Sequence, residues 1–289
     1  MNVWRLHIKS AAESGQNPQE FCVSNNIAGI GWPVNTKREK LNKTQFEKLC
    51  RSEYGKLPGA VNAMVYRIVE GDYIWTRNKN QDYFLGKIAS DWEFNNSQEF
   101  KDNDVVNHRK VAEWKKIGKL SEIPGKVVSA FRATSALQQI DSDAIRLISD
   151  YIWNGIRSET INQKLDFFDL IGDEALEDLV GIYLQMEEDY MIVPSTCKSD
   201  TALYEFSLIH RKTGKNAYLQ VKSGHSFADL NKMLENEAKV YYFQKHKEER
   251  SEYEKLIHIS EAEIWEFIKN HQAILPENIK VWLNFCNHN

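Results

Sequence analysis

The stretch from Asp200 to Lys222 constrains the fold of this 289-residue chain most, because its pattern is that of a β-hairpin with polar ends. Between residues 204 and 209, apolar and polar side chains alternate with the period of two that is typical of a strand. A Thr-Gly-Lys turn follows at 213–215, and a second apolar run covers residues 217–221. We therefore expect two antiparallel strands joined by a tight turn.

The polar ends of this hairpin are the candidate site. Because side chains alternate across a strand, Gln220 and Lys222 share one face, and Val221 lies on the other. This face can bring the amide and the ammonium group beside Asp200 or Glu205. Carboxylates gathered beside an amide and an ammonium group suit a hydrolase assisted by a hard divalent cation such as Mg²⁺ or Mn²⁺.

An acid, a β-turn and then Gln-x-Lys on the next strand resemble the core of the PD-(D/E)XK nucleases. The Gln-Val-Lys run at 220–222 is similar to the Mrr-like restriction endonuclease branch, in which Gln replaces the usual acid. Upstream, LEDLVGIYLQ resembles the opening helix of the family, with Glu177 at the position of its glutamate, and DYMIVPSTCKSD resembles the first strand. The resemblance covers residues 166–282.

The resemblance implies a restriction-endonuclease-like α/β/α core with a mixed sheet, and it assigns roles to residues. Asp200 would bind the metal, and Glu177 would reach it directly or through a water. Gln220 would lend its side-chain oxygen, and Lys222 would position the attacking water and counter the charge of the transition state. Glu205 is the alternative metal ligand, since it falls one residue after the second acid of the family pattern DGGxD. Such nucleases commonly act as homodimers, so that both DNA strands are cut.

The first half resembles a small PUA/EVE-type β-barrel, a class that includes readers of flipped, modified bases. The resemblance rests on four pieces: Trp4, Gly29-Ile30-Gly31-Trp32, Gly71-Asp72-Tyr73-Ile74-Trp75 and Leu85-Gly86-Lys87-Ile88. A flipped base needs aromatic faces for stacking and polar contacts to its edge. The candidates for the walls of such a pocket are Trp32, Trp75, Tyr83 and Trp92.

We predict a two-domain α+β and α/β chain with a reader domain at 1–135, a helical linker at 136–165 and a nuclease domain at 166–289. Apolar runs predict strands at 3–8, 21–34, 73–77 and 83–89, and further strand-like runs between 105 and 131. Helical spacing predicts helices at 36–54, 60–69 and 140–157. The basic residues from Arg109 to Arg132 form a candidate stripe for a phosphate backbone.

Composition excludes several other classes of protein. The formal charge of −4 gives no global signature of nucleic-acid binding, although acidic residues around a metal lower the charge of any nuclease. Four scattered cysteines without a CxxC pair give neither a zinc knuckle nor a disulfide framework. No stretch approaches the ~20 apolar residues needed to cross a bilayer. These observations predict a cytoplasmic protein with no membrane partner.

We therefore expect a Mg²⁺-dependent endodeoxyribonuclease that recognises DNA carrying a modified base, in the manner of a restriction or anti-phage defence enzyme. Two alternatives remain open. One is a non-catalytic nucleic-acid-binding module that keeps the nuclease core as a scaffold. The other is a defence nuclease that is switched on by a small nucleotide messenger bound in the first half.

Overall fold

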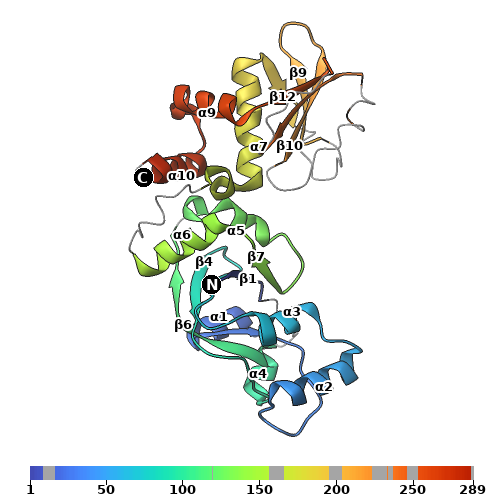
Figure 1. Ribbon diagram of the computed structural model, residues 1–289, viewed down its shortest axis with the longest axis vertical. Coiled ribbons are helices and arrows are strands. Elements are labelled where there is room, and N and C mark those ends of the chain that lie inside the picture. The colour runs from blue at the N-terminus through green and yellow to red at the C-terminus, as the bar shows by residue number, and fades with distance from the viewer. Residues whose placement is uncertain are drawn as a thin grey trace. The chain divides into compact units, whose positions relative to one another are not determined.

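The computed structural model describes residues 1–8, 17–118, 120–155, 166–194, 204–222, 233, 237–245 and 253–287. The chain divides into two compact units, Met1–Leu165 and Asp166–Asn289. Each unit contains its own β-sheet and its own helices (Figure 1). The fold is therefore mixed α/β, with one sheet in each unit.

The first unit contains a seven-stranded sheet surrounded by short helices. Its strands are β1 (Val3–Leu6), β2 (Ile27–Ile30), β3 (Tyr73–Arg77), β4 (Tyr83–Ile88), β5 (Glu93–Phe94), β6 (Asn107–Lys116) and β7 (Leu137–Ile140). Its helices are α1 (Pro18–Ser24), α2 (Lys43–Tyr54), α3 (Gly59–Asn62), the π-helix η1 (Ala63–Arg67), α4 (Gln98–Asp102), the 3-10 helix η2 (Leu120–Glu122), α5 (Gly125–Ala130) and α6 (Asp143–Asn154).

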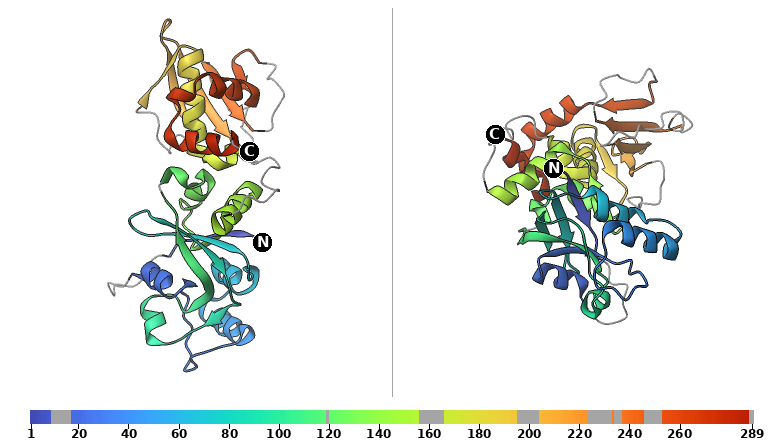
Figure 2. Two further views of the ribbon diagram at one scale, coloured as in Figure 1. Left: turned by 90° about the vertical axis from the view of Figure 1, so that its left-hand side faces the viewer. Right: turned by 60° about the horizontal axis from the view of Figure 1, so that its bottom comes forward.

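The first sheet is mixed and curled. Its strand order is β2-β6-β4-β3-β1-β7, and β5 pairs with β6. Strand β1 runs parallel to β3, and the remaining pairs are antiparallel. Figure 2 shows the long strand β6 bending through the unit, first beside β2 and β5 and then beside β4. Since this path has free edges at β2 and β7, the described strands form a half-barrel and not a closed barrel.

Strands β1 and β3 are joined by side chains as well as by the ladder. Asp72, which is fully buried, accepts hydrogen bonds from the indole Nε1 of Trp4 at 2.9 Å and from the backbone N of Asn2 at 2.7 Å. Trp4 and Ile74 belong to the buried core on one face of the sheet. The opposite face carries Arg5, because successive side chains of a strand point to opposite faces.

Two segments that we predicted as strands contain helices. Residues 18–24 form α1 because the side chain of Asn17 accepts a hydrogen bond from Glu20 N and a proline occupies the first turn. Residues 125–130 form α5, in which Val127 is fully buried and its N–H donates to the oxygen of Pro124. Capping in α1 and burial of Val127 in α5 outweigh the strand propensity of these aromatic and valine-rich runs.

The region that we predicted as a linker is a structural part of the first unit. Strand β7 pairs with β1 over four residues, from Val3 opposite Ile140 to Leu6 opposite Leu137. Helix α6 packs on β1, β3 and β4, and its buried Ser149 accepts a hydrogen bond from the indole of Trp75 at 3.0 Å. Residues 137–154 therefore complete the first sheet and do not form a separate connection.

The second unit contains a five-stranded mixed sheet in the order β12-β11-β10-β9-β8. Strands β8, β9 and β10 are antiparallel, whereas β10, β11 and β12 are parallel. Its strands are β8 (Tyr190–Ile192), β9 (Phe206–His210), β10 (Asn216–Lys222), β11 (Lys239–Gln244) and β12 (Leu256–Ile259). Its helices are α7 (Phe167–Glu187), α9 (Glu261–Asn270), the 3-10 helix η5 (Gln272–Ile274) and α10 (Glu277–Asn287).

The hairpin predicted from alternation is confirmed as β9 and β10, with Gly214 in the turn at a φ of 67°. A capping box begins α9, because Ser260 and Glu263 exchange both hydrogen bonds. Helix α7 lies against the sheet (Figure 1) and is kinked at Gly172, whose φ of 75° breaks the helical path. Asp166 caps its first turn, because its side chain accepts hydrogen bonds from the backbone N of Phe168 and of Asp169.

Within the described ranges, no helix has both the length and the apolar character needed to span a bilayer.

Candidate functional site

Three of the predicted catalytic residues meet at the end of the β9–β10 hairpin. The amide Nε2 of Gln220 donates to Oε1 of Glu205 at 2.6 Å, and Nζ of Lys222 lies 3.5 Å from the same oxygen. Gln220 is buried, whereas the side chains of Glu205 and Lys222 are 26% and 33% exposed. The cluster of Glu205, Gln220 and Lys222 is therefore open to solvent on one side only.

The hairpin register brings these residues together. Phe206 is paired with Leu219, and the backbone N of Glu205 donates to the oxygen of Leu219 at 2.8 Å. Glu205 thus lies beside Gln220 at the start of β9, which is the edge where β10 ends with Lys222. Both oxygens of a carboxylate accept hydrogen bonds, yet in the described part of the chain no group donates to Oε2 of Glu205.

Helix α7 begins at the same edge of the sheet. Lys245, which follows β11, donates through its backbone N to the oxygen of Lys222 at 3.1 Å. Its buried ammonium group contacts Asp166 and Asp169 at the start of α7, the latter at 2.8 Å. Burial opposes the charge of Lys245, but the hydrogen bonds that its ammonium group donates to these two carboxylates outweigh this effect and raise the pKa of Lys245.

Glu177 lies farther along α7, and its side chain is half-buried. Gly181, one turn later on the same side of the helix, lies against the sheet, since a Cβ there would come within 2.9 Å of Ile192 Cδ1. Glu177 therefore lies on the side of α7 that faces the sheet. Asp200, the first choice for the metal ligand, lies outside the described residues.

The donor types in the cluster suit a hard divalent cation, although they form only part of a binding site. Such cations take carboxylate and carbonyl oxygens as ligands, and Oε2 of Glu205 is a carboxylate oxygen to which none of the described groups donates. The amide of Gln220 turns its nitrogen, and not the expected oxygen, towards Glu205. Within the described ranges no group of three His, Cys, Asp or Glu side chains is arranged to hold a metal ion. Any further ligand would therefore come from another part of the chain or from water.

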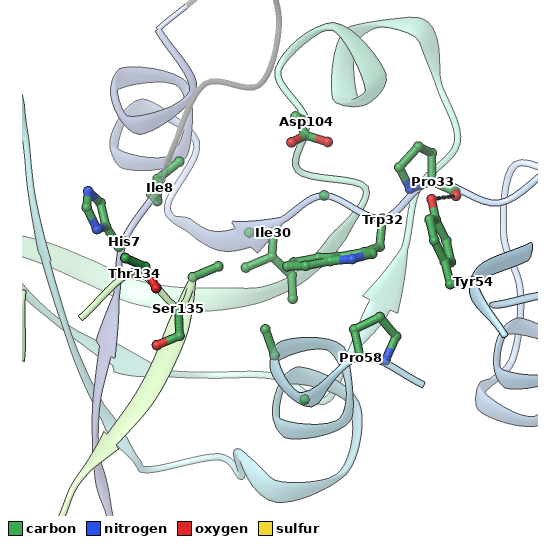
Figure 3. A pocket seen from close by; sticks show the side chains of 15 residues that line it. His7, Ile8, Ile30, Trp32, Pro33, Tyr54, Pro58, Asp104, Thr134 and Ser135 are labelled. Carbon is green, nitrogen blue, oxygen red and sulfur yellow. Dashed lines mark hydrogen bonds between the residues drawn. The ribbon is translucent and has the colours of Figure 1, made fainter. Parts of the chain in front are cut away.

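A second candidate site is a pocket of about 650 Å³ in the first unit. Its lining is mostly apolar and comes from five distant parts of the chain: residues 7–8, 29–33, 54 with 58–60, 104 and 134–136. Figure 3 shows the indole of Trp32 crossing the pocket, with Asp104 on one side and Pro58 on the other. Its volume lies in the range of small-molecule sites, and the polar groups of Asp104 and Ser135 lie on its wall.

The backbone holds Trp32 and Asp104 in unusual conformations. Their φ angles are 63° and 52°, a left-handed region that a bulky side chain such as tryptophan rarely adopts. Such strain is found where the surrounding structure fixes a functional group. Burial raises the pKa of Asp104, so its carboxyl is easier to protonate than an exposed one.

The carbonyls before and after this strained step are held by Asn107, a buried residue. Its Nδ2 donates to the oxygens of Gly31 at 2.5 Å and Trp32 at 3.3 Å. The indole Nε1 of Trp92 in turn donates to Oδ1 of Asn107 at 3.2 Å. Trp92 therefore supports the pocket from behind and does not line it.

Of the four aromatic residues predicted for the base pocket, Trp32 alone lines it. Trp75 is fully buried and donates to Ser149, so it joins α6 to the sheet. Tyr83 is also buried, and its ring packs edge-on against Phe131 at 5.6 Å between centroids. These two side chains are part of the core, where large aromatic residues at strand spacing are often found.

The basic stripe predicted between Arg109 and Arg132 is not a free cationic surface. Arg109 is 2% exposed and donates to the carbonyls of Met64 and Val65 at the end of the π-helix η1. The lysines on β6 have acidic neighbours: Lys110 with Glu93, Lys115 with Glu113 and Lys116 with Asp82. These charges are therefore engaged within the first unit.

Sequence reasoning missed Asp104 and Asn107, the polar groups that shape the Trp32 pocket. Both lie in or beside a polar stretch that has the pattern of an ordinary loop. The one local signal was the Gly29-Ile30-Gly31-Trp32 step, in which Gly31 leaves room for Asp104. Residues so far apart in the chain cannot be grouped by periodicity.

No protein-family model matches this chain, and the comparison with curated proteins found no significant match.

Proposed function

We propose that this protein is a divalent-metal-dependent DNA endonuclease whose first unit recognises a modified base. The observation that carries the proposal is the meeting of Glu205, Gln220 and Lys222 at one edge of a mixed sheet. The order of the second unit also supports it, because a helix, three antiparallel strands and a parallel strand follow one another as the PD-(D/E)XK resemblance implies. A homodimer would allow both strands to be cut.

Each group of the cluster has a task that its position suits. Glu205 offers a carboxylate oxygen to the cation, and Gln220 holds that carboxylate through its amide N–H. Bound Mg²⁺ or Mn²⁺ would neutralise the phosphate oxygens and lower the pKa of a water. The ammonium group of Lys222, partly exposed, is placed to orient that water and to stabilise negative charge as the phosphodiester is attacked.

The pocket around Trp32 supports the proposed recognition of a modified base. Its apolar walls and the flat indole suit a planar heterocycle, and the half-buried carboxyl of Asp104 can bond to the polar edge of a base. A base that carries an N–H group at this edge would be preferred, because a carboxylate only accepts hydrogen bonds. DNA with a modified base is therefore the proposed substrate, and a restriction or defence role follows from it.

The proposal is tested by incubating the purified full chain with Mg²⁺ and a panel of plasmid and phage DNAs that carry different base modifications. The wild type is expected to cut at least one of these DNAs. Lys222→Ala should lose the cleavage by a hundredfold or more, on the order of the loss seen when a group that stabilises transition-state charge is removed.

Lys212→Ala is the matched control. Lys212 lies in the turn of the same hairpin and pairs with Asp189 at the far end from the cluster. Its removal takes away one positive charge from the same element and should leave cleavage unchanged. Equal activity in the wild type and in Lys222→Ala would show that the cluster is not the catalytic site.

A further inference from the structure

A second, smaller pocket of about 200 Å³ adjoins the Trp32 pocket. The two pockets share His7 and Ile8 in their walls. The polar part of the smaller pocket comes from Gln19 in α1 and from Arg77 and Lys79 at the end of β3. None of the described residues in its lining carries a carboxylate, so this described part of the lining is positively charged.

The wall behind this pocket holds an unusual concentration of positive charge. Arg5 is fully buried, and its hydrogen-bond partners within the described ranges are neutral: the backbone oxygen and Oγ of Ser135, and Oε1 of Gln138. A buried charge ordinarily has an acidic partner, because desolvation is costly otherwise. Burial, and secondly the neighbouring Arg77, lower the pKa of Arg5 to about 10.

Arg5 and Arg77 are close because they lie on adjacent parallel strands and face the same side of the sheet. Arg5 pairs with Trp75 in the register, and Arg77 follows two residues later. Both guanidinium groups lie over the ring of Phe131, at 5.7 and 4.9 Å from its centroid. The hydrogen-bond partner of Arg77 is the hydroxyl of Tyr83 at 3.3 Å, which carries no charge. Among the residues of the first unit that the structure describes, no carboxylate forms an ion pair with either of these two cations.

The lining of this pocket also includes Gln19, whose side chain has a hydrogen-bond donor with no acceptor among the described residues. Gln19 is 7% exposed, and its side-chain Nε2 is buried without a hydrogen-bond partner. Buried polar groups are nearly always hydrogen-bonded, so such an exception calls for a ligand or a water. The nearest carboxylate along the hairpin, Asp82, is engaged by Asn78 and Lys116.

We propose that the smaller pocket is a phosphate subsite, in which Arg77, Lys79 and Gln19 bind the phosphate of a nucleotide whose base lies against Trp32. This inference rests on the proposed recognition of a base. It assigns to the first unit a ligand with two parts, a planar base and an adjoining phosphate. The phosphate belongs either to a DNA backbone or to a free nucleotide, and the chemistry of the subsite is the same for both.

The test uses the full chain in EDTA and a short fluorescein-labelled duplex that carries the modified base bound most tightly. Each phosphate that flanks this base is replaced in turn by an uncharged methylphosphonate, and affinity is measured by fluorescence anisotropy. For the wild type, one replacement should weaken binding about tenfold, the scale of one charge-assisted hydrogen-bonded contact. In Arg77→Gln the same replacement should change nothing, because the contact is already lost.

Two further variants complete the design. Lys79→Gln alters an exposed side chain, so it preserves the fold even if Arg77→Gln does not. In this variant the methylphosphonate replacement should weaken binding less than it does in the wild type. Arg146→Gln removes an exposed arginine of α6 that pairs with Asp143, and it should behave as the wild type. A replacement that weakens the wild type, Arg77→Gln and Lys79→Gln equally would overturn the phosphate subsite.

Failure of the subsite and failure of base recognition give different results. If Trp32→Ala removes the preference for the modified base while Arg77→Gln and Lys79→Gln bind as the wild type does, the subsite is wrong and base recognition stands. If no duplex is bound in a base-dependent manner, the proteins are titrated with nucleosides and with their 5′-monophosphates by calorimetry. A preference for monophosphates that Arg77→Gln abolishes assigns the subsite to a free nucleotide, and no such preference overturns it.

Discussion

Oδ1 of Asp104 occupies the space that a Cβ atom on Gly31 would need, since an ideal Cβ there would lie 2.1 Å from it. The two residues are far apart in the chain, and both line the Trp32 pocket. A side chain at residue 31 would therefore displace the carboxyl that we propose to contact the base.

Gly31→Ala should reduce both stability and ligand binding. The added methyl group overlaps the Asp104 carboxylate and costs about 1 to 3 kcal/mol, the usual range for overpacking. Gly59→Ala is the matched control, because Gly59 lines the same pocket and a Cβ there meets nothing within 4 Å. Urea unfolding of both variants checks the prediction, which fails if the two lose equal amounts of stability.

Stability should depend on pH through Asp104. Burial raises the pKa of this carboxyl in the folded protein, so the fold binds its proton more tightly than the unfolded chain does. Stability is therefore lost as pH rises from the ordinary aspartate pKa, about 4, through the higher folded pKa. Asp104→Asn removes this loss, and its advantage over the wild type should be larger at pH 7 than at pH 4.

Chemical denaturation at the two pH values measures this advantage. Asp141→Asn, a change at an exposed carboxyl before α6, should show no such pH-dependent difference. An advantage of Asp104→Asn that is the same at pH 4 and pH 7 would contradict the role of burial.

Trp92→Phe and Trp75→Phe should both lower the stability of the first unit, but only Trp92→Phe should also lower ligand binding. Each change removes one buried indole hydrogen bond and should cost about 1 kcal/mol of stability. Only Trp92→Phe should also weaken ligand binding, because Asn107 then loses its orientation towards the carbonyls of Gly31 and Trp32. Anisotropy with labelled DNA decides the point, and equal losses of affinity would refute it.

Gln220→Glu should make the stability of the second unit sensitive to Mg²⁺. The new carboxylate would stand beside that of Glu205, where Gln220 now donates at 2.6 Å, and the two would repel each other without a cation. Added Mg²⁺ should raise the Tm of this variant by about 2 to 4 °C for each kcal/mol of binding free energy, and more than it raises that of the wild type.

The control for this variant is Gln272→Glu, which adds the same charge at an exposed position. Thermal unfolding in EDTA and in Mg²⁺ gives the shift for all three proteins. A shift that is no larger in Gln220→Glu than in Gln272→Glu would remove Glu205 from the metal site.

The hairpin and its cluster could be predicted from the sequence because their signals are local. The alternation of 204–222 indicates which side chains share a face, and the turn at Gly214 sets the register of the two strands. These two local signals are enough to bring Gln220 and Lys222 beside Glu205, one of the two acids that the sequence left open. The capping box at Ser260 is equally local. Where strand and helix propensities compete, as at 125–130, the outcome depends on tertiary burial that no local pattern contains.

The Trp32 pocket could be predicted only in part for the same reason. Its strands and its tryptophan have local patterns, but Asp104, Asn107 and Ser135 reach it through the topology of the half-barrel. Likewise, Arg5 and Arg77 are close because β1 pairs with β3 in parallel, and no local sequence pattern predicts this pairing. Sequence reasoning instead placed the candidate phosphate contacts on β6, where the basic side chains have acidic partners.

The central claim is that the first unit selects a modified base and the cluster at the β9–β10 hairpin cuts the DNA. It is tested most directly by measuring binding and Mg²⁺-dependent cleavage on two plasmids that differ only in the base modification, with wild type, Trp32→Ala and Lys222→Ala. We expect that the wild type cuts the modified plasmid alone, that Lys222→Ala binds it without cutting, and that Trp32→Ala loses the preference. Cleavage by both variants with the rate and preference of the wild type would contradict it.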